Sequence, residues 1–307
     1  MNTTRHTRHV LVLLCSWSVL SWAVGGPLRA EDNSDQQLDW NQWRGPHRTG
    51  QLEGPPWPDS LEPSALQSLW RVELQPSYSG PIVSGDRVFV TETVEAQTER
   101  VTALDRRDGS VLWTQEWKGA MKVPFFARSR GDWIRATPIC DGETVYVAGM
   151  RDLLVALDAE TGAVRWRVDF VKEFETPLPS FGFVCSPLLD GDDLYVQAAA
   201  SVVKLNRKTG EVIWRSMQDS GGMMDSAFSS PILENLAERR QLVVQTRESL
   251  AGLDPETGQV LWQQEVPAFR GMNILTPTLA GDRVFTSSYG GRSFLYQVVR
   301  DGDQYRV

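Results

Sequence analysis

Few side chains in this 307-residue chain combine into a pattern that supports catalysis. Two of its three histidines lie within the first nine residues, in a segment with the features of an export signal, which leaves His47 as the one imidazole of the expected mature chain. One imidazole cannot build a histidine-based metal cluster, and a Ser/His/Asp mechanism would have to rest on it alone. The carboxylates of Glu175, Asp219 and Asp225 match no catalytic motif. We therefore expect neither a catalytic residue nor a metal ligand.

Four loop segments carry side chains that suit binding better than catalysis. They cover residues 118–135, 171–184, 218–228 and 266–273. Soft and aromatic side chains on exposed loops are typical of a binding surface. The same side chains could instead fill the grooves between neighbouring sheets, and the sequence leaves both interpretations open. The candidate binding residues are Phe125, Phe126, Arg128, Arg130, Trp133, Phe181, Phe183, Met223, Met224 and Phe269.

The first of these loops is locally basic although the chain is acidic. Its basic residues, opposed by Asp132 alone, are Lys118, Lys122, Arg128, Arg130 and Arg135. The net charge of the whole chain is -8, and removal of residues 1–30 takes away three arginines and no acid, which makes it -11. This sign disfavours a nucleic-acid partner. The basic loop either binds an anionic ligand or partner or is a solvated run of charges.

The N-terminus has the features of a secretory signal peptide. Basic residues precede an apolar run over residues 10–24, and small residues follow it up to Ala30. This run is shorter than the roughly 20 residues that a helix needs to cross a bilayer. Leu14, just before Cys15, is too bulky for a lipoprotein cleavage site. We therefore expect a signal peptide over residues 1–30, a periplasmic or secreted protein, and no transmembrane segment after signal removal.

One ten-residue phrase recurs along the chain and indicates how these loops are positioned. It reads LDAETGAVRW at 157–166, LNRKTGEVIW at 205–214 and LDPETGQVLW at 253–262, with a variant that ends at residue 113. The tryptophans that end it, Trp113, Trp166, Trp214 and Trp262, are 53, 48 and 48 residues apart. A period of about 40 to 50 residues built from short strands is typical of propeller blades. We therefore expect an all-β protein.

Each unit predicts four antiparallel strands. In PICDGETVYVAG, Asp141 and Gly142 supply the positive φ of a two-residue hairpin between the first two strands. LLVALD is the third strand and AVRWRVDF is the fourth and outermost. Gly closes the turn between these two without a Cβ penalty, and the tryptophan lays a flat surface against the neighbouring blade. The docking residues are the four tryptophans together with Gly109, Gly162, Gly210 and Gly258.

The spacing A-x-D-x-x-T-G-x-x-x-W resembles the tryptophan-docking motif of the pyrroloquinoline-quinone (PQQ) repeat propellers. The resemblance covers residues 66–307 and follows an N-terminal segment at 31–65. Members of the family usually close an eight-bladed ring, whereas about five units are visible here, which predicts an incomplete ring. Trp70 lies in what looks like a lone outer strand, which would either close a five-membered ring or flank an open arc.

The segment DWNQWRGPHRTG, residues 39–50, resembles one that precedes the repeats in exported bacterial members of the same family. Its residues Trp40, Trp43 and Arg44 could form an aromatic and cationic ligand site. Alternatively, the two tryptophans pack against the propeller, because buried tryptophan is mainly a large apolar surface.

The resemblance implies two functions that differ in class. The family includes the quinoprotein alcohol dehydrogenases, which hold PQQ and Ca²⁺ and carry a disulfide between adjacent cysteines, and a non-catalytic propeller of the outer-membrane assembly machinery. Cys140 and Cys185 are not adjacent, and their places in the repeat, about four strand positions or roughly 13 Å apart, predict separate buried thiols. We therefore expect no cofactor and a non-enzymatic scaffold for a protein or envelope polymer, with a PQQ- and calcium-dependent oxidoreductase as the alternative.

Overall fold

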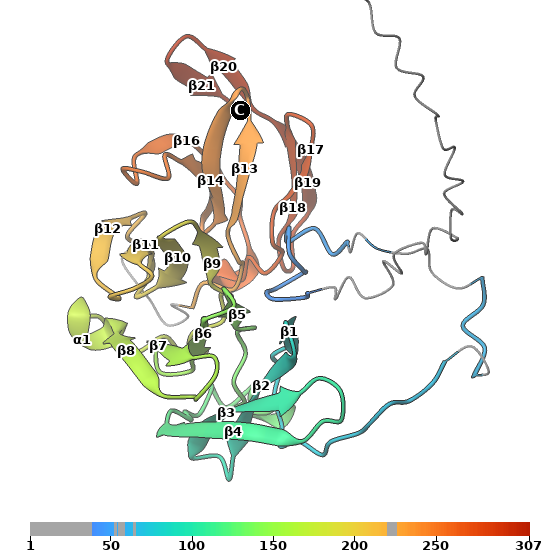
Figure 1. Ribbon diagram of the computed structural model, residues 1–307. Helices are drawn as coiled ribbons and strands as arrows, with labels where there is room; N and C mark the ends of the chain where they lie inside the picture. The colour runs from blue at the N-terminus through green and yellow to red at the C-terminus, as the bar shows by residue number, and fades with distance from the viewer. Residues whose placement is uncertain (1–38, 52–53, 55–58, 64–65, 220–225) are drawn as a thin grey trace, which may run out of the picture. The chain divides into compact units, whose positions relative to one another are not determined.

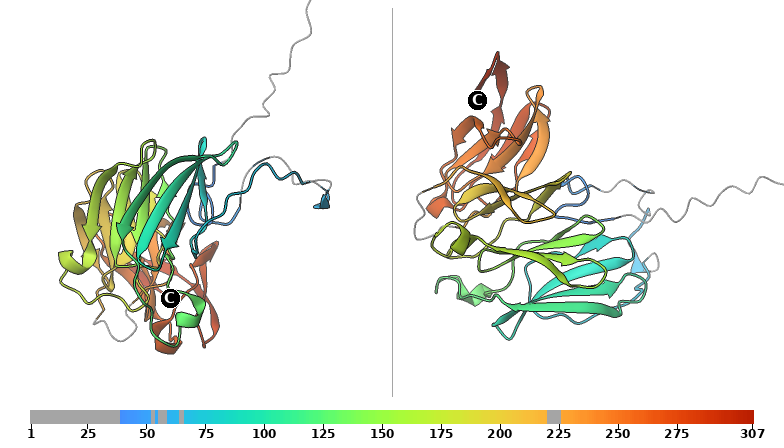
Figure 2. Two further views of the ribbon diagram at one scale, coloured as in Figure 1. Left: turned by 90° about the horizontal axis from the view of Figure 1, so that it is seen from below. Right: turned by 60° about the vertical axis from the view of Figure 1, so that its left-hand side comes forward.

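Antiparallel sheets follow one another along the chain, and each is formed by one unit of the repeat (Figure 1). The computed structural model describes residues 39–51, 54, 59–63, 66–219 and 226–307. Within each sheet the strands pair in chain order, so every sheet is a meander of hairpins. Consecutive sheets lie side by side in the views of Figures 1 and 2, which is how propeller blades are arranged.

Four of the sheets have four strands. The first contains β1 (Ile82–Ser84), β2 (Arg87–Val94), β3 (Thr98–Asp105) and β4 (Val111–Lys118). The second contains β5 (Ile139–Cys140), β6 (Thr144–Gly149), β7 (Leu153–Asp158) and β8 (Val164–Asp169). The third contains β9 (Leu188–Asp190), β10 (Asp193–Ala198), β11 (Ser201–Asn206) and β12 (Val212–Ser216). The fourth contains β13 (Ile232–Leu236), β14 (Arg239–Gln245), β15 (Ser249–Leu253) and β16 (Val260–Glu265).

The fifth unit differs because its sheet has three strands. These are β17 (Thr278–Ala280), β18 (Arg283–Ser287) and β19 (Ser293–Gln297). A separate hairpin of β20 (Val299–Asp301) and β21 (Gln304–Arg306) follows, with β21 against β16. The helical elements that the structure describes here are the short η3 (Arg128–Arg130), α1 (Phe170–Glu173) and η4 (Phe269–Gly271), and none of the described helices could cross a membrane. The prediction of an all-β propeller that forms an incomplete ring is confirmed.

Burial decreases from the middle strands of a sheet to its fourth strand. Every residue of β6 is buried, whereas β8 is half-buried or exposed along its whole length. A strand covered on both faces favours a continuous apolar sequence, and TVYVAG has one. The apolar core therefore lies between neighbouring sheets, and its clusters join residues of consecutive units.

An indole from the fourth strand of one sheet covers a turn glycine of the next sheet. The pairs are Trp113 on Gly162, Trp166 on Gly210 and Trp214 on Gly258. A Cβ atom at any of these glycines would come within 2.8 Å of the ring, and each glycine has a φ of +73° to +77°. Each indole N–H also donates to a main-chain carbonyl of the same turn, at 2.9–3.2 Å. Van der Waals contact and a hydrogen bond therefore lock each pair of sheets together.

The turns are held by side chains of the repeated phrase itself. The carboxylate of Asp158 accepts hydrogen bonds from both the amide and the hydroxyl of Thr161 at 2.8 Å. Asp108 stands where the later units have threonine, and it accepts from the amide of Ser110 at 2.8 Å as the threonine hydroxyls do in their turns. The substitution therefore preserves the turn.

The tryptophans at the two ends of the series behave differently from each other. Trp70 covers Gly109 of the first sheet and donates to the carbonyl of Arg106 at 2.9 Å, although its segment forms no strand. Trp262 was expected to dock on a following unit, but its N–H donates at 2.6 Å to Gln241 of its own sheet. It folds back because the fifth unit has no T-G turn, and Gly252 leaves room for the ring.

A second set of bonds links the starts of the first strands. The amide of Gly80 donates to the hydroxyl of Thr137 at 3.2 Å, and the amide of Thr137 donates to Ser186 at 3.0 Å. The amide of Ser186 donates in turn to the hydroxyl of Ser230 at 2.9 Å. Each of these hydroxyl residues directly precedes the proline that opens its unit, a pattern that sequence analysis did not use.

The docking geometry predicts that two turn glycines differ in their tolerance of alanine. Gly191→Ala adds a Cβ with no atom within 4 Å at a φ of +56°, and we expect it to cost about 1 kcal/mol of backbone strain. Gly210→Ala has similar strain and also forces the indole of Trp166 away, so we expect roughly 3 kcal/mol. Thermal unfolding of both variants tests this. Equal melting temperatures would contradict the docking role.

Candidate binding face

The loops that connect successive sheets emerge at one end of them. Lys118, the last residue of β4, pairs with Thr98, which begins β3 just after the β2–β3 turn. The connecting loop and that turn therefore lie at the same end of the first sheet. The same relation holds between the end of β8 at Asp169 and the start of β7 at Leu153. We call this end the loop face.

Aromatic rings from several loops form a continuous series of contacts on the loop face. Phe125 and Phe126 are 5.6 Å apart between ring centroids, and Phe126 is 6.3 Å from Phe181. Phe181 in turn lies 5.4 Å from Phe228, from the loop that precedes the fourth sheet. Three successive connecting loops therefore contact one another through aromatic rings.

Arg270 extends this series to a fourth loop. Its guanidinium carbon lies 5.2 Å above the ring of Phe126 and 5.0 Å above that of Phe269, and Phe269 is 6.3 Å from Tyr289. A cation over an aromatic ring is attracted by the quadrupole of the ring. Arg270 also has a φ of +56° inside η4, a conformation that is uncommon outside glycine and that is concentrated at functional sites. We call the six rings and Arg270 the aromatic face.

Exposure separates the predicted loop residues into two groups. Phe125 is 80% exposed, Phe126 46% and Phe269 54%. Phe181 and Phe183 are buried, so of the two interpretations left open for these candidates the packing one holds, and neither offers an exposed ring for binding. Phe181 packs with Val123 and Met150, and Phe183 meets the ring of Phe170 edge-on. Met223 and Met224 lie outside the described residues, as does the predicted signal peptide.

The basic side chains of the first loop are partly used within the loop. Arg128 and Arg130 are exposed, although the Nε of Arg128 donates to the carbonyl of Val123 at 3.1 Å. Arg135 stacks over the ring of Tyr78 at 4.9 Å. Trp133 lies 5.1 Å from the same tyrosine ring and is not one of the aromatic-face rings. Some basic side chains of this loop therefore make contacts within the protein, and others face solvent.

Two buried carboxyl groups support the loop face from below. Glu99 accepts from the indole of Trp117 and from the amide of Met150 in the second sheet, each at 2.7 Å. Asp152 likewise accepts from the amide of Ala199 in the third sheet at 2.7 Å. Burial raises the pKa of Glu99 to about 7 and that of Asp152 to about 6, because it penalises the charged form.

The N-terminal segment runs along the first strands of several sheets. Trp40 pairs with Val83 of β1 through two hydrogen bonds of 2.9 Å, and the carbonyl of Asn41 accepts from the amide of Cys140 at 2.9 Å. The buried Arg48 donates to the carbonyl of Pro187 at 2.7 Å, and Trp43 donates to Thr276 at 3.2 Å. The segment therefore covers free strand edges, which favours packing over a ligand site.

The arginine and cysteines of this region are structural in their contacts. Arg44 donates to the carbonyl of Thr49 within its own segment at 3.1 Å. Cys140 and Cys185 are buried free thiols, as predicted, and burial raises the pKa of Cys140 to about 11 and that of Cys185 to about 12. Neither thiol is therefore ionised near neutral pH.

Acidic side chains do not gather into a metal site in the described part of the chain. No three His, Cys, Asp or Glu side chains come together there, whereas calcium takes six to eight oxygen ligands. Glu175 is exposed, Asp219 is paired with Arg247, and Asp225 lies outside the described residues. The described part of the chain therefore holds no cluster of three such side chains around which a calcium site could be built.

Sequence analysis missed Arg270, Phe228, Tyr289 and Glu99. Phe228 and Arg270 stand in the loops that were singled out, and an arginine directly after Phe269 was a usable signal. Tyr289 comes from a turn of the fifth sheet, and its proximity to Phe269 depends on the tertiary fold. Glu99 looks like an ordinary polar strand residue until the next sheet covers it.

These features define a β-propeller with tryptophan-docked blades and an aromatic loop face. The chain matches a family model described as outer membrane protein assembly factor BamB over residues 61–127 and 97–306. It belongs to that family.

Individual relatives are distant and longer. A polyvinylalcohol dehydrogenase of Sphingopyxis is 24% identical over 192 residues, which cover 57% of this chain and 28% of the relative. An uncharacterized protein of Rickettsia conorii is 28% identical over 141 residues, 44% of this chain and 31% of the relative. The chain thus spans about a third or less of the length of these curated relatives.

Among solved structures, the quinohemoprotein alcohol dehydrogenase ADHIIG of Pseudomonas putida superposes with a TM-score of 0.50 at 16% identity. The match covers 75% of this chain and 42% of that enzyme. This similarity supports the propeller fold and nothing finer.

The raised pKa of Glu99 predicts a pH-dependent difference from Glu99→Gln. Its pKa is about 7 in the folded chain against a usual 4.5. At a pH between these two values, the Glu99 carboxyl therefore takes up a proton when the chain folds. The neutral carboxyl contributes its full stabilisation at a pH below the pKa of the unfolded chain. This contribution is lost as the pH rises through the pKa of the folded chain. The glutamine variant stays neutral, but its NH2 group cannot accept a hydrogen bond, so the N–H of Trp117 or Met150 loses its acceptor. We therefore expect the variant to melt below the parent at about pH 5 and this difference to narrow towards about pH 8, as the parent loses stability.

Thermal melts across this pH range, on both proteins in matched buffers, make the comparison. Asp86→Asn, which removes an exposed turn acid by the same acid-to-amide change, is the control variant. A constant difference between Glu99→Gln and the parent at all pH values would contradict the buried-acid assignment.

Proposed function

We propose that this protein is a non-enzymatic scaffold that binds a protein partner in the cell envelope through its aromatic face. The observation that carries the proposal is the exposure of Phe125, Phe126 and Phe269 within one series of contacts. Aromatic rings and arginine are the side chains that most often dominate binding energy at protein interfaces. The family description, an assembly factor, agrees with a role in binding proteins.

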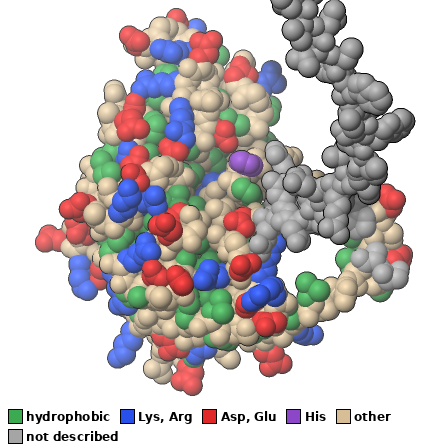
Figure 3. All heavy atoms as spheres, viewed as in Figure 1, with side chains coloured by type: hydrophobic (Ala, Val, Ile, Leu, Met, Phe, Trp, Pro, Cys, Tyr) green, Lys and Arg blue, Asp and Glu red, His purple; other side chains and the backbone are tan. Residues whose placement is uncertain are grey.

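The construction of the aromatic face suits a rigid binding surface. Phe126 rests on the buried Phe181, and Glu99 fixes the β6–β7 turn through the amide of Met150, which packs with Phe181. Little conformational entropy is then lost when a partner covers the exposed rings. Acidic and basic side chains are mixed over the side of the molecule that Figure 3 shows.

A capture experiment tests the proposal. The mature chain is immobilised and incubated with a solubilised envelope extract of its source, and the captured proteins and polysaccharides are quantified. The double variant Phe125→Ser, Phe126→Ser should lose at least one partner by more than about 30-fold, the effect of removing about 2 kcal/mol of contact. Leu112→Ser removes an apolar side chain of similar exposure, 44% against 46% for Phe126, at the far end of β4.

Two results would decide against the aromatic face. Equal capture by the double variant and the parent is one, and equal loss in Leu112→Ser is the other. Melting temperatures of both variants must match that of the parent for the comparison to count. If the double variant loses capture of a polysaccharide rather than of a protein, the partner is an envelope polymer.

The alternative, an oxidoreductase that uses PQQ and calcium, has a direct ligand test. The described acids provide no matching site, so we expect PQQ with Ca²⁺ to leave the melting temperature unchanged. A native-state ligand at 100 times its Kd would stabilise the fold by about 2.7 kcal/mol. A saturable rise in melting temperature that requires both components would therefore overturn the scaffold assignment.

A further inference from the structure

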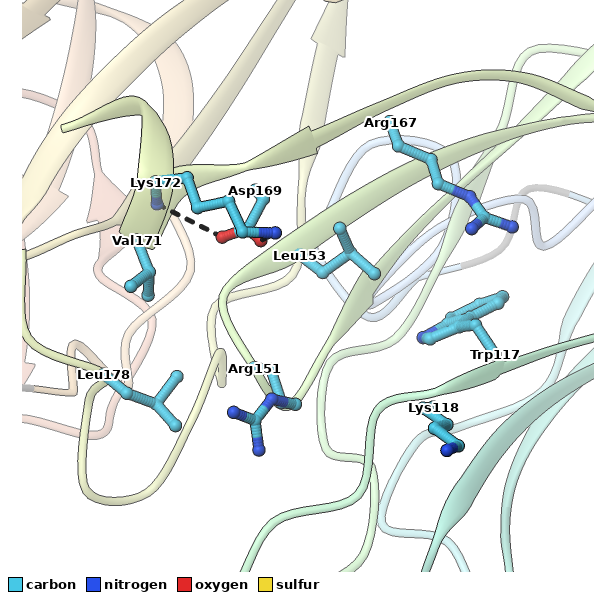
Figure 4. A pocket seen from close by; sticks show the side chains of 9 residues that line it. All are labelled: Trp117, Lys118, Arg151, Leu153, Arg167, Asp169, Val171, Lys172 and Leu178. Atoms are coloured by element: carbon cyan, nitrogen blue, oxygen red, sulfur yellow. Dashed lines mark hydrogen bonds and ion pairs between the residues drawn. The ribbon is translucent and has the colours of Figure 1, made fainter. Parts of the chain in front are cut away.

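A cleft of about 610 Å³ opens between the first and second sheets at the loop face (Figure 4). Its apolar lining includes Trp117 at the end of β4, Leu153 at the start of β7, and Leu178 from the following loop. None of these residues belongs to the aromatic face. The cleft lies within the size range of ligand pockets, which extends from about 300 to 1,000 Å³.

Cations surround this apolar lining. Lys118, Arg151 and Arg167 are exposed at the cleft, and none of the three forms an ion pair within the part of the chain that the structure describes. The one carboxylate among the lining residues, Asp169, is bound to Lys172 at 2.6 Å and also caps α1 (Figure 4). The cleft therefore presents uncompensated positive charge on a protein whose net charge is -8.

Glu99 is the acid that acts on Arg151 from below the cleft. Its charge would be attracted to Arg151, but both of its oxygens accept hydrogen bonds from Trp117 and Met150. It is also buried, so it adds no carboxylate surface to the cleft. An anionic group of a ligand can therefore bind the positive charge at the cleft opening.

The repeat itself shows what fills the equivalent place in another pair of sheets. The fifth residue after the docking tryptophan is Asp219 in the third unit and Lys118 in the first. The second residue before the third strand is Arg247 in the fourth unit and Arg151 in the second. Asp219 and Arg247 form a bidentate pair at 2.8 and 3.2 Å. The first pair of sheets has a lysine where that carboxylate stands.

Arg167 also differs from its counterpart in the next sheet. Arg215, which likewise follows a docking tryptophan, stacks on Phe174 at 4.1 Å and donates to the carbonyl of Ala199 at 2.9 Å. Among the contacts that the structure gives for Arg167 there is no such ring and no such acceptor. The N–H groups of Arg151 and Arg167 are therefore available to a ligand, whereas Arg247 and Arg215 use theirs for contacts within the protein.

We infer that this cleft binds a peptide segment that carries a carboxylate next to an aliphatic side chain. The carboxylate lies between Lys118 and Arg151, where the third and fourth sheets have Asp219 beside Arg247, and the aliphatic side chain covers Trp117 and Leu153. Arginine binds carboxylates through two parallel hydrogen bonds, which gives this anion a geometric preference. The inference concerns residues outside the aromatic face and does not depend on the proposed function.

Strand edges beside the cleft favour a peptide over a small anion. β4 and β8 are the outermost strands of their sheets, and within the described ranges each pairs with one neighbour only. Their free edges offer main-chain donors and acceptors to an extended segment, as in other complexes that add a strand to a sheet. A peptide can therefore pair its carboxylate with the cations, its aliphatic side chain with the apolar lining and its main chain with a strand edge.

The test uses fluorescence anisotropy with an end-blocked, labelled hexapeptide of alternating Leu and Glu, at low salt. The matched peptide has Gln in place of Glu. We expect the Glu peptide to bind at least about tenfold more tightly, because charge-assisted hydrogen bonds are lost in the other. Added salt should weaken the Glu peptide alone.

Variants of the chain complete the test. Lys118→Asp recreates the acid beside Arg151 and should lower peptide affinity at least about tenfold without lowering the melting temperature. Arg167→Gln should also weaken binding, and it serves if the first variant fails to fold. Arg283→Asp makes the same change of charge on β18, outside the cleft lining, and should leave binding unchanged.

Three results would overturn the inference. They are equal affinity for the Glu and Gln peptides, binding that Lys118→Asp and Arg167→Gln do not change, and an equal loss of affinity in Arg283→Asp. Binding of inorganic phosphate by the parent chain, with no binding of the Glu peptide, would also overturn it by assigning the cleft to small anions.

Discussion

The fold depends on one contact, an indole laid flat on a glycine of the neighbouring sheet. Its geometry leaves no space for a Cβ atom, and its N–H fixes the ring to a carbonyl of the same turn. A propeller sheet cannot bury both faces alone, so the free energy of folding depends on how neighbouring sheets meet. A contact repeated between the first four sheets therefore sets their spacing and that of the loops they carry.

Loops at one end of docked sheets converge, and their side chains become a surface that no single unit has. Phe126 and Arg270 are 144 residues apart in the sequence, and they touch because three units intervene in regular order. Below them, Glu99 and Asp152 each bind an amide of the next sheet. The aromatic face therefore rests on polar contacts between sheets as well as on apolar packing.

Repetition also makes departures from the repeat meaningful. Asp219 and Arg247 satisfy each other, whereas the equivalent positions of the first two sheets hold Lys118 and Arg151. Like charges at a position built for an ion pair raise the free energy of the unliganded protein, unless solvent or a ligand compensates them. The cleft and the aromatic face are thus two different departures from a regular scaffold.

The sequence by itself determined the fold class, the order of the strands and the docking residues of the middle units. It could do so because strand periodicity, turn glycines and the tryptophan phrase are local signals that recur. The sequence could not decide whether Phe181 or Phe125 is exposed, because both are apolar loop residues and burial depends on what the next loop covers. Nor could it show that Trp262 turns back, that Arg270 stacks on Phe126, or that Glu99 is buried. Those outcomes depend on contacts between residues far apart in the chain, which only the tertiary structure brings together.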